Sequence, residues 1–261
     1  MASAAPAYEE RGMSIGRVFQ RAFATIAHNP SVVLGLVVLL GVLPSVLFSY
    51  LANLTGTFDW TGAHGPVNWA VVTLSWVISI VIAAVLQGAL IRATVEENEG
   101  RHSGFAECVA AGFRVCLPLF VVDLIFLIAM TIGFVLLIVP GILVMVVWSL
   151  AAPAVAVERG GIMRSFGRSA ELTKGHRWKI FGLFLILAAI YAVEFVVFAE
   201  VGMVTMTPPP SGQMGPLNII ANVITSLVFN LLWGTIQPAL YVELRQSGEG
   251  GSPQDLEQVF A

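Results

Sequence analysis

Charged side chains are scarce in this sequence. They make up 11% of its 261 residues, against about 25% in an average soluble domain. Hydrophobic residues make up 57%, and a single water-soluble core of this length cannot bury so much apolar surface. The shortage of charge therefore excludes an ordinary soluble domain and indicates that lipid surrounds much of the chain.

Cysteine and the common catalytic motifs are also nearly absent. Cys108 and Cys116 are the two cysteines, and both lie in a segment placed below on the reducing cytoplasmic side, where disulfides are rare. The four histidines are scattered, so no metal site is expected. The chain lacks a secretory signal, a glycine-rich phosphate loop, a nucleophile elbow and a His-Glu-x-x-His motif. We therefore expect no enzymatic activity, no catalytic residues and no cofactor.

Long apolar runs are what the sequence has instead. A helix that crosses a bilayer needs about 20 mostly apolar residues. Six segments of a membrane domain over 13–245 meet this requirement: 32–51, 69–91, 116–137, 141–157, 180–201 and 219–240. Pro140-Gly141 is the expected turn between the third segment and the fourth. We predict an all-α polytopic protein with six transmembrane helices, a disordered N-terminal tail over 1–12 and a C-terminal tail over 246–261.

Basic residues are missing from every second loop. The 13 lysines and arginines all lie before the first predicted span, between the second and third, between the fourth and fifth, or after the sixth. The loops at 52–68, around 140 and at 202–218 contain none. Because Lys and Arg concentrate in cytoplasmic loops, this pattern predicts that both termini are cytoplasmic. The location that we expect is the bacterial inner membrane.

A short motif occurs twice. The segments Ile15-Gly-Arg-Val-Phe-Gln-Arg21 and Ile162-Met-Arg-Ser-Phe-Gly-Arg168 share the pattern I-x-R-x-F-x-R, and Phe105–Phe113 keeps the apolar spacing without the arginines. All three are amphipathic, which is typical of helices in the membrane interface or packed on the inner end of a bundle. We expect such helices at about 14–28, 103–115 and 161–174, each followed by two spans. The membrane domain is therefore predicted to contain three repeats of an amphipathic helix plus a hairpin.

The ends of the predicted span pairs are also alike. Ala152-Pro-Ala-Val155 closes the fourth span and Gln237-Pro-Ala-Leu240 the sixth, with Gln87-Gly-Ala-Leu90 in the second. The two prolines each precede a glutamate by five residues, Glu158 and Glu243. This shared spacing favours duplication of one unit.

The stretch from Pro140 to Lys179 resembles a known family. It contains Pro140-Gly-Ile142, Trp148, the run Ala151–Glu158 and the basic run Arg164–Lys179. These look like the signature of the glycerophosphoryl diester phosphodiesterase membrane-domain family, and they are similar to the YciC-type uncharacterised inner-membrane proteins. The resemblance extends over about 13–245 and implies fold and location alone. The phosphodiesterase barrel that names the family takes about 250 residues, for which this chain has no room.

Polar side chains at membrane depth are the first candidates for function. Asp123 lies two turns into the third span, where it either pairs with an arginine of the inner rim or takes part in transport. Glu194 has no basic residue on its side of the membrane, so we expect it to be protonated or to face water. Asn222 and Asn230, eight residues apart, either bond between helices or line a pathway.

The basic residues are the second group of candidates. Each cation near an anionic membrane surface contributes about 1 kcal/mol of attraction, and the residues expected to contact anionic headgroups are Arg17, Arg21, Arg164, Arg168, Lys174, Arg177 and Lys179. No nucleic-acid partner is expected. The sequence favours a non-enzymatic membrane protein that contacts lipids, a second copy or another membrane protein as an envelope scaffold or modulator. The alternative is a transporter for a small or lipid-like substrate that uses Asp123 and Glu194.

Overall fold

The described part of the chain is helical. The computed structural model describes residues 13–54, 69–158, 160–205 and 216–249, and every regular element in these ranges is a helix. Six stretches in them are long and apolar enough to cross a membrane: Pro30–Leu51, Thr73–Asn98, Phe105–Leu136, Ile138–Glu158, Arg177–Val197 and Ile219–Gly248. This confirms the all-α class and the six long apolar helices. The predicted tail over 1–12 and most of the tail over 246–261 lie outside the described residues.

The first apolar stretch is a helix of three parts. After α1 (Ile15–His28), the elements α2 (Pro30–Leu36), η1 (Val37–Val42) and α3 (Leu43–Leu54) follow without a loop. Pro30 occupies the first turn of α2, where its missing N–H costs nothing. The central part, η1, is a π-helix that ends just before Pro44. Proline cannot donate to the preceding turn and its ring crowds that turn, which accounts for a π-helix at this position.

The second amphipathic segment differs from its prediction. We expected an interfacial helix over 103–115 and a separate span over 116–137, but α5 (Phe105–Leu136) is one helix of 32 residues. Pro118 lies inside it, and apolar helices in membranes tolerate such a proline. The helix packs closely on α4 (Trp69–Asn98). A β-carbon on Gly88 would lie 2.9 Å from the Cα atom of Gly112, so two glycines allow the two backbones to approach.

The fourth predicted span is divided. Instead of one helix over 141–157, the chain forms α6 (Ile138–Trp148) and α7 (Ala151–Glu158) with a turn at Ser149-Leu150. The hairpin turn between α5 and α6 lies at the extended residue Leu137 rather than at Pro140-Gly141. Pro140 is in the first turn of α6, where proline is compatible with a helix.

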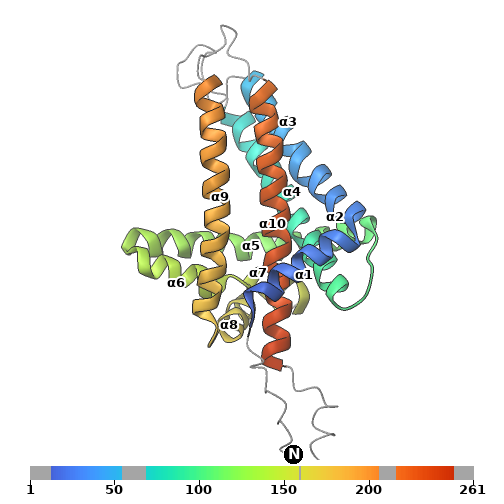
Figure 1. Cartoon of the computed structure of the whole chain (residues 1–261), viewed down its shortest axis with the longest axis vertical. Helices are drawn as coiled ribbons and strands as arrows, with labels where there is room; N and C mark the ends of the chain where they lie inside the picture. The colour runs from blue at the N-terminus through green and yellow to red at the C-terminus, as the bar shows by residue number, and fades with distance from the viewer. Residues whose placement is uncertain (1–12, 55–68, 159, 206–215, 250–261) are drawn as a thin grey trace, which may run out of the picture.

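Two long helices define the axis of the molecule. After α8 (Ile162–Leu172), α9 (Arg177–Thr205) and α10 (Pro216–Glu249) run side by side along the long axis. The hairpin of α5 and α6 lies across them and extends past α9 to one side (Figure 1). The residues at its tip, 135–139, are 65–81% exposed although all five are Val, Leu or Ile. The α5–α6 hairpin therefore differs in direction from α9 and α10.

The buried core joins the two ends of the chain. One cluster of apolar side chains connects α1 with α5, α7, α8, α9 and α10, and Tyr241 at its centre is fully buried. A second cluster packs α2 and η1 against α4 and α10. Since α1 contacts the C-terminal half of α10, the first helix and the last one close the fold at the same end of the molecule.

Candidate functional site

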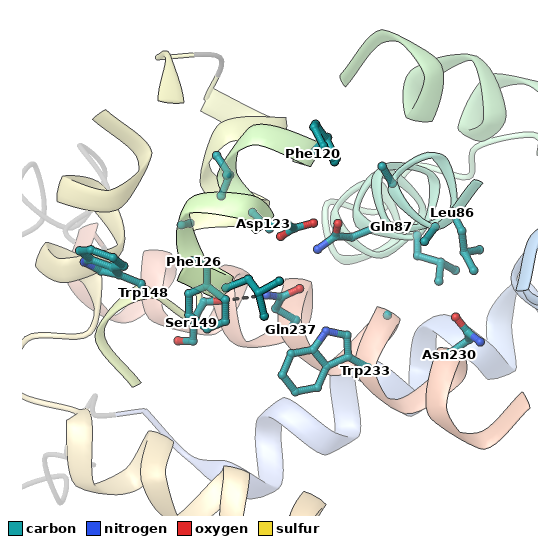
Figure 2. Close-up of a pocket in the computed structure, with 18 of the residues that line it drawn as sticks. Leu86, Gln87, Phe120, Asp123, Phe126, Trp148, Ser149, Asn230, Trp233 and Gln237 are labelled. Atoms are coloured by element: carbon teal, nitrogen blue, oxygen red, sulfur yellow. Dashed lines mark hydrogen bonds between the residues drawn. The ribbon is translucent and has the colours of Figure 1, made fainter. Parts of the chain in front are cut away.

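A cavity of about 420 Å³ lies where the crossing hairpin meets the long helices. It is lined by residues of α4, α5, α6, α7, α9 and α10, and Figure 2 shows these side chains pointing into it from several helices. The predicted candidates Asp123 and Asn230 both line it. The structure thus brings together two residues that are more than a hundred positions apart in the sequence.

Four polar side chains of the cavity come from three helices. Asp123 on α5 faces the side-chain amide of Gln87 on α4, within hydrogen-bonding reach. Asn230 and Gln237 follow on α10, two turns apart. The amide of Asn230 donates to the carbonyl of Ser226 at 2.7 Å. Asp123 therefore has an amide neighbour rather than the arginine of the inner rim that we considered.

The break between α6 and α7 forms one edge of the cavity. The Nε2 atom of Gln237 donates to the carbonyl oxygen of Ser149 at 2.7 Å (Figure 2). The Ser169 hydroxyl of α8 donates to the carbonyl of Val147 at 2.7 Å and accepts the N–H of Leu150 at 3.1 Å. Two side chains thus satisfy backbone groups that the broken helix leaves open.

Aromatic rings form much of the remaining wall. Trp233 on α10 stacks with Phe184 and with Phe229, with ring centroids 6.0 and 6.4 Å apart. Trp148 and Phe126 line the cavity near the helix break. Sequence reasoning did not assign these aromatic residues or Gln87 to a site, because each is unremarkable within its own helix. The repeated position shared by Gln87 and Gln237 was the available signal.

The other two intramembrane candidates lie elsewhere. Asn222 bonds with the hydroxyls of Ser45 and Ser49, both at 3.4 Å, so it ties α10 to α3 as interhelical amides do. Glu194 on α9 does not line the cavity. Its Oε1 atom and the hydroxyl of Tyr191, one turn away, are both buried without a hydrogen-bond partner among the described residues. Glu194 therefore stays a separate candidate.

The basic residues gather where α1, α8 and the end of α10 meet. Glu243 on α10 is 3% exposed and accepts from Arg17 Nε at 2.6 Å and from Arg21 Nε at 3.1 Å. Glu158 on α7 accepts from Arg168 Nε at 2.8 Å and from the hydroxyl of Tyr241 at 2.8 Å. Three of the seven expected lipid-contact residues thus bind carboxylates of this chain.

The remaining four differ in their contacts. Lys179 donates to the backbone carbonyl of Met13 at 3.1 Å, which fastens the start of α9 to the segment before α1. Arg164, Lys174 and Arg177 are exposed. Trp178, beside Arg177, is 84% exposed although tryptophan is large and apolar. These three cations and the tryptophan are the described surface that best fits a headgroup region.

A second cavity, of about 360 Å³, is more polar and was not predicted. It lies between the end of α4, the start of α5 and α7, and its charged lining residues are Arg92, Glu96, Glu99, Arg101 and Arg114. Arg92 pairs with Glu96 at 3.0 Å and Arg101 pairs with Glu99. Among the described residues, no group of three or more His, Cys, Asp and Glu is placed to hold a metal ion.

Comparison with known proteins gives a family but no named relative. No curated protein and no solved structure matches the chain. One family model, described as a domain of unknown function, DUF7847, matches residues 102–244. The match runs from just before α5 into the last part of α10, so it covers more than half of the chain and most of the cavity. The chain belongs to the DUF7847 family.

Proposed function

We propose that this protein is a non-enzymatic integral protein of the bacterial inner membrane that contacts anionic lipids and acts as a scaffold or modulator of the envelope. Both termini are then cytoplasmic. The observation that carries the proposal is the meeting of α1, α8 and the end of α10 at one end, where the cations lie. Such an asymmetry is what cytoplasmic orientation produces.

The lipid contact is proposed for Arg164, Lys174, Arg177 and Trp178. Arg17, Arg21 and Arg168 bind Glu243 or Glu158, so their charge is partly neutralised within the chain. Exposed cations next to an exposed tryptophan and to Met163, which is 76% exposed, fit the boundary between headgroups and acyl chains. At about 1 kcal/mol each, three cations contribute about 3 kcal/mol of attraction.

The test is lipid preference of the purified protein. We expect native mass spectrometry to show more bound phosphatidylglycerol than phosphatidylethanolamine, and salt to weaken the preference. The triple variant R164Q/K174Q/R177Q should lose it, whereas R164K/K174R/R177K, with the same charge, should keep it. An unchanged preference in the glutamine variant contradicts the lipid-contact proposal.

The contacts at the basic end support the proposed repeat. In the alignment of the two I-x-R-x-F-x-R segments, Arg21 corresponds to Arg168, and Glu243 corresponds to Glu158 because each follows a span-closing proline by five residues. Arg21 binds Glu243 and Arg168 binds Glu158, so equivalent residues make equivalent pairs. We propose on this basis that the amphipathic helices α1 and α8 belong to duplicated units. The relation to the glycerophosphoryl diester phosphodiesterase membrane-domain family stays a prediction.

A second candidate function is transport of a small or lipid-like substrate. The observation that favours it is the cavity that contains Asp123, because an ionisable residue at membrane depth marks many substrate pathways. Glu194 enters this proposal only as a separate site on α9. A flux assay in proteoliposomes tests it: transport that is lost in D123N supports this function, and flux that is equal in D123N, E194Q and the wild type argues against it. A homo-oligomer or another membrane protein as partner is compatible with both candidates.

A further inference from the structure

The cavity between α4, α5, α7 and α10 combines one carboxylate with aromatic walls. We propose that it binds an organic cation with an apolar body, whose positive group lies against Asp123 and whose body packs on Trp233 and its neighbouring rings. The site differs from the lipid-contact surface in place and in the charge of its ligand. If the protein is a transporter, as in the second candidate function, organic cations would be its substrate class. Binding of the cation itself does not depend on transport.

The polar side chains of the cavity are one carboxylate, three amides and one hydroxyl. Gln237 donates to the carbonyl of Ser149 and Asn230 donates to the carbonyl of Ser226, both at 2.7 Å. An amide that donates one hydrogen bond to the backbone in this way keeps its carbonyl oxygen and its second N–H for a ligand. Gln87 faces Asp123 and steadies its carboxylate. The amides can bind donors or acceptors, and the carboxylate of Asp123 favours a ligand that brings a positive charge.

The charge of the residues that line the cavity also favours a cation as the ligand. Of the described residues that line the cavity, Asp123 is the one acidic residue and none is Lys, Arg or His. An anionic headgroup placed here would meet a carboxylate without a counter-charge, which is costly away from water. A cation, in contrast, supplies the counter-charge that Asp123 lacks among the lining residues. This separates the cavity from the exposed arginines and Lys174, which suit anionic headgroups.

The rings give the cavity its shape and a second attraction for a cation. The stack of Phe184, Trp233 and Phe229 forms one continuous wall, and Trp148 lies on the opposite side near Ser149. A cation over an aromatic face is attracted by the ring, most strongly by tryptophan. A volume of about 420 Å³ lies within the range of sites that hold small organic molecules, roughly 300–1,000 Å³.

A helix is interrupted next to the cavity, as is often found at substrate sites in membrane proteins. The turn at Ser149-Leu150 interrupts the apolar stretch Ile138–Glu158 next to the cavity. Irregular backbone at membrane depth is tolerated where it is buried in protein or lines a cavity, and broken helices often form substrate sites. The break, held by Ser169 and Gln237, therefore agrees with a ligand site at this position.

The experiment uses two ions of the same shape and opposite charge. Tetraphenylphosphonium, an apolar cation, and tetraphenylborate, the matching anion, are titrated into the full-length protein in detergent micelles by calorimetry, with empty micelles as the blank. We expect the wild type to bind the cation at least about tenfold more tightly than the anion. D123N should weaken binding of the cation by about tenfold, because the carboxylate is lost while shape is kept.

The matched control is E194Q, which removes an intramembrane carboxylate that does not line the cavity. It should bind the cation as the wild type does. Trp233→Leu keeps Asp123 and removes the central ring, and it should also weaken binding, which provides a second test if D123N does not fold. Absence of binding to the wild type, equal binding of the two ions, or unchanged binding in both D123N and Trp233→Leu overturns the proposal. None of these results alters the lipid preference tested with the arginine variants.

Discussion

Arg17 and Glu243, 226 positions apart, form a hydrogen-bonded ion pair with Nε and Oε1 2.6 Å apart. The carboxylate is 3% exposed, and its other oxygen accepts from Arg21. The backbone N–H of Ser14 also donates to Oε1 of Glu243, at 3.3 Å. One buried side chain near the C-terminal end of α10 thus holds the start of α1 against the bundle.

Glu243→Gln should therefore destabilise the protein. The substitution keeps the size of the side chain but removes the charge to which two arginines bind, and hydrogen bonds to charged groups contribute about 1.5–3 kcal/mol each. We expect a loss of about 3 kcal/mol, since the arginines regain some hydration. A thermal unfolding series in detergent measures it. Glu171→Gln, at an exposed carboxylate 3.9 Å from Arg168, is the control and should change stability by less than about 0.5 kcal/mol. Equal effects of both substitutions would contradict this role of Glu243.

Gly112→Ala should disturb the packing of α5 on α4. A β-carbon at this position would overlap the backbone carbonyl oxygen of Val85, and a backbone neighbour cannot turn away as a side chain can. We expect the two helices to move apart and the unfolding midpoint to fall, at a cost of about 1–3 kcal/mol.

Gly167→Ala is the matched control for that substitution. Gly167 lies in α8, and a β-carbon there meets no atom within 4 Å. Alanine favours a helix over glycine by about 0.5–1 kcal/mol, so this variant should be as stable as the wild type or slightly more so. A stable Gly112→Ala variant would mean that α4 and α5 are not in close contact.

The tip of the α5–α6 hairpin should be shielded from water. Because the hairpin lies across α9 and α10 and its tip is apolar and exposed, we expect acyl chains rather than an aqueous loop around Leu137. In a C108A/C116A background, Leu137→Cys should not react with a membrane-impermeant maleimide added from either side. Gln246→Cys should react once the cytoplasmic side is opened, and denatured protein should react at both positions. Labelling of Leu137→Cys from the outer side would show that α5 and α6 cross the membrane separately.

The charge distribution makes a prediction about topology. Reporter domains fused after residue 60 or residue 210, positions in loops without Lys or Arg, should report the outer side of the membrane. A fusion after Gln246 should report the cytoplasm, since Arg245 and the other basic residues belong to the inner side. A cytoplasmic signal at residue 60 or 210 would contradict the orientation proposed for the whole protein.

Much of the fold could be predicted because hydropathy and charge are properties of single residues and do not depend on contacts between distant residues. The first, second, fifth and sixth predicted spans correspond to apolar stretches of the structure, and α1 and α8 begin within a residue of their predicted starts. The errors came where helices join or break. Pro118, three residues after the predicted boundary at 115, does not end the helix, so α5 continues through that boundary. The break at Ser149 depends on Ser169 from another helix.

The candidate site was predictable only in its parts. Asp123, Asn230 and Glu194 were recognisable because polar groups are costly in lipid wherever they lie. That Asp123 and Asn230 share a cavity with Gln87 and Gln237, while Glu194 does not, could not be read from spacing within any one helix. Likewise, nothing in the sequence distinguishes the arginines that bind Glu243 from the arginines that stay exposed.

The sequence by itself determined that lipid surrounds much of this protein, how many long apolar helices it has, and how unevenly its basic residues are distributed along the chain. Each of these properties follows from the transfer of single residues between water and lipid. The tertiary structure decided the direction of the α5–α6 hairpin, the partners of Arg17, Arg21 and Arg168, and the cavity around Asp123. These depend on how closely helix backbones approach and at what angle they cross, which packing between distant residues sets.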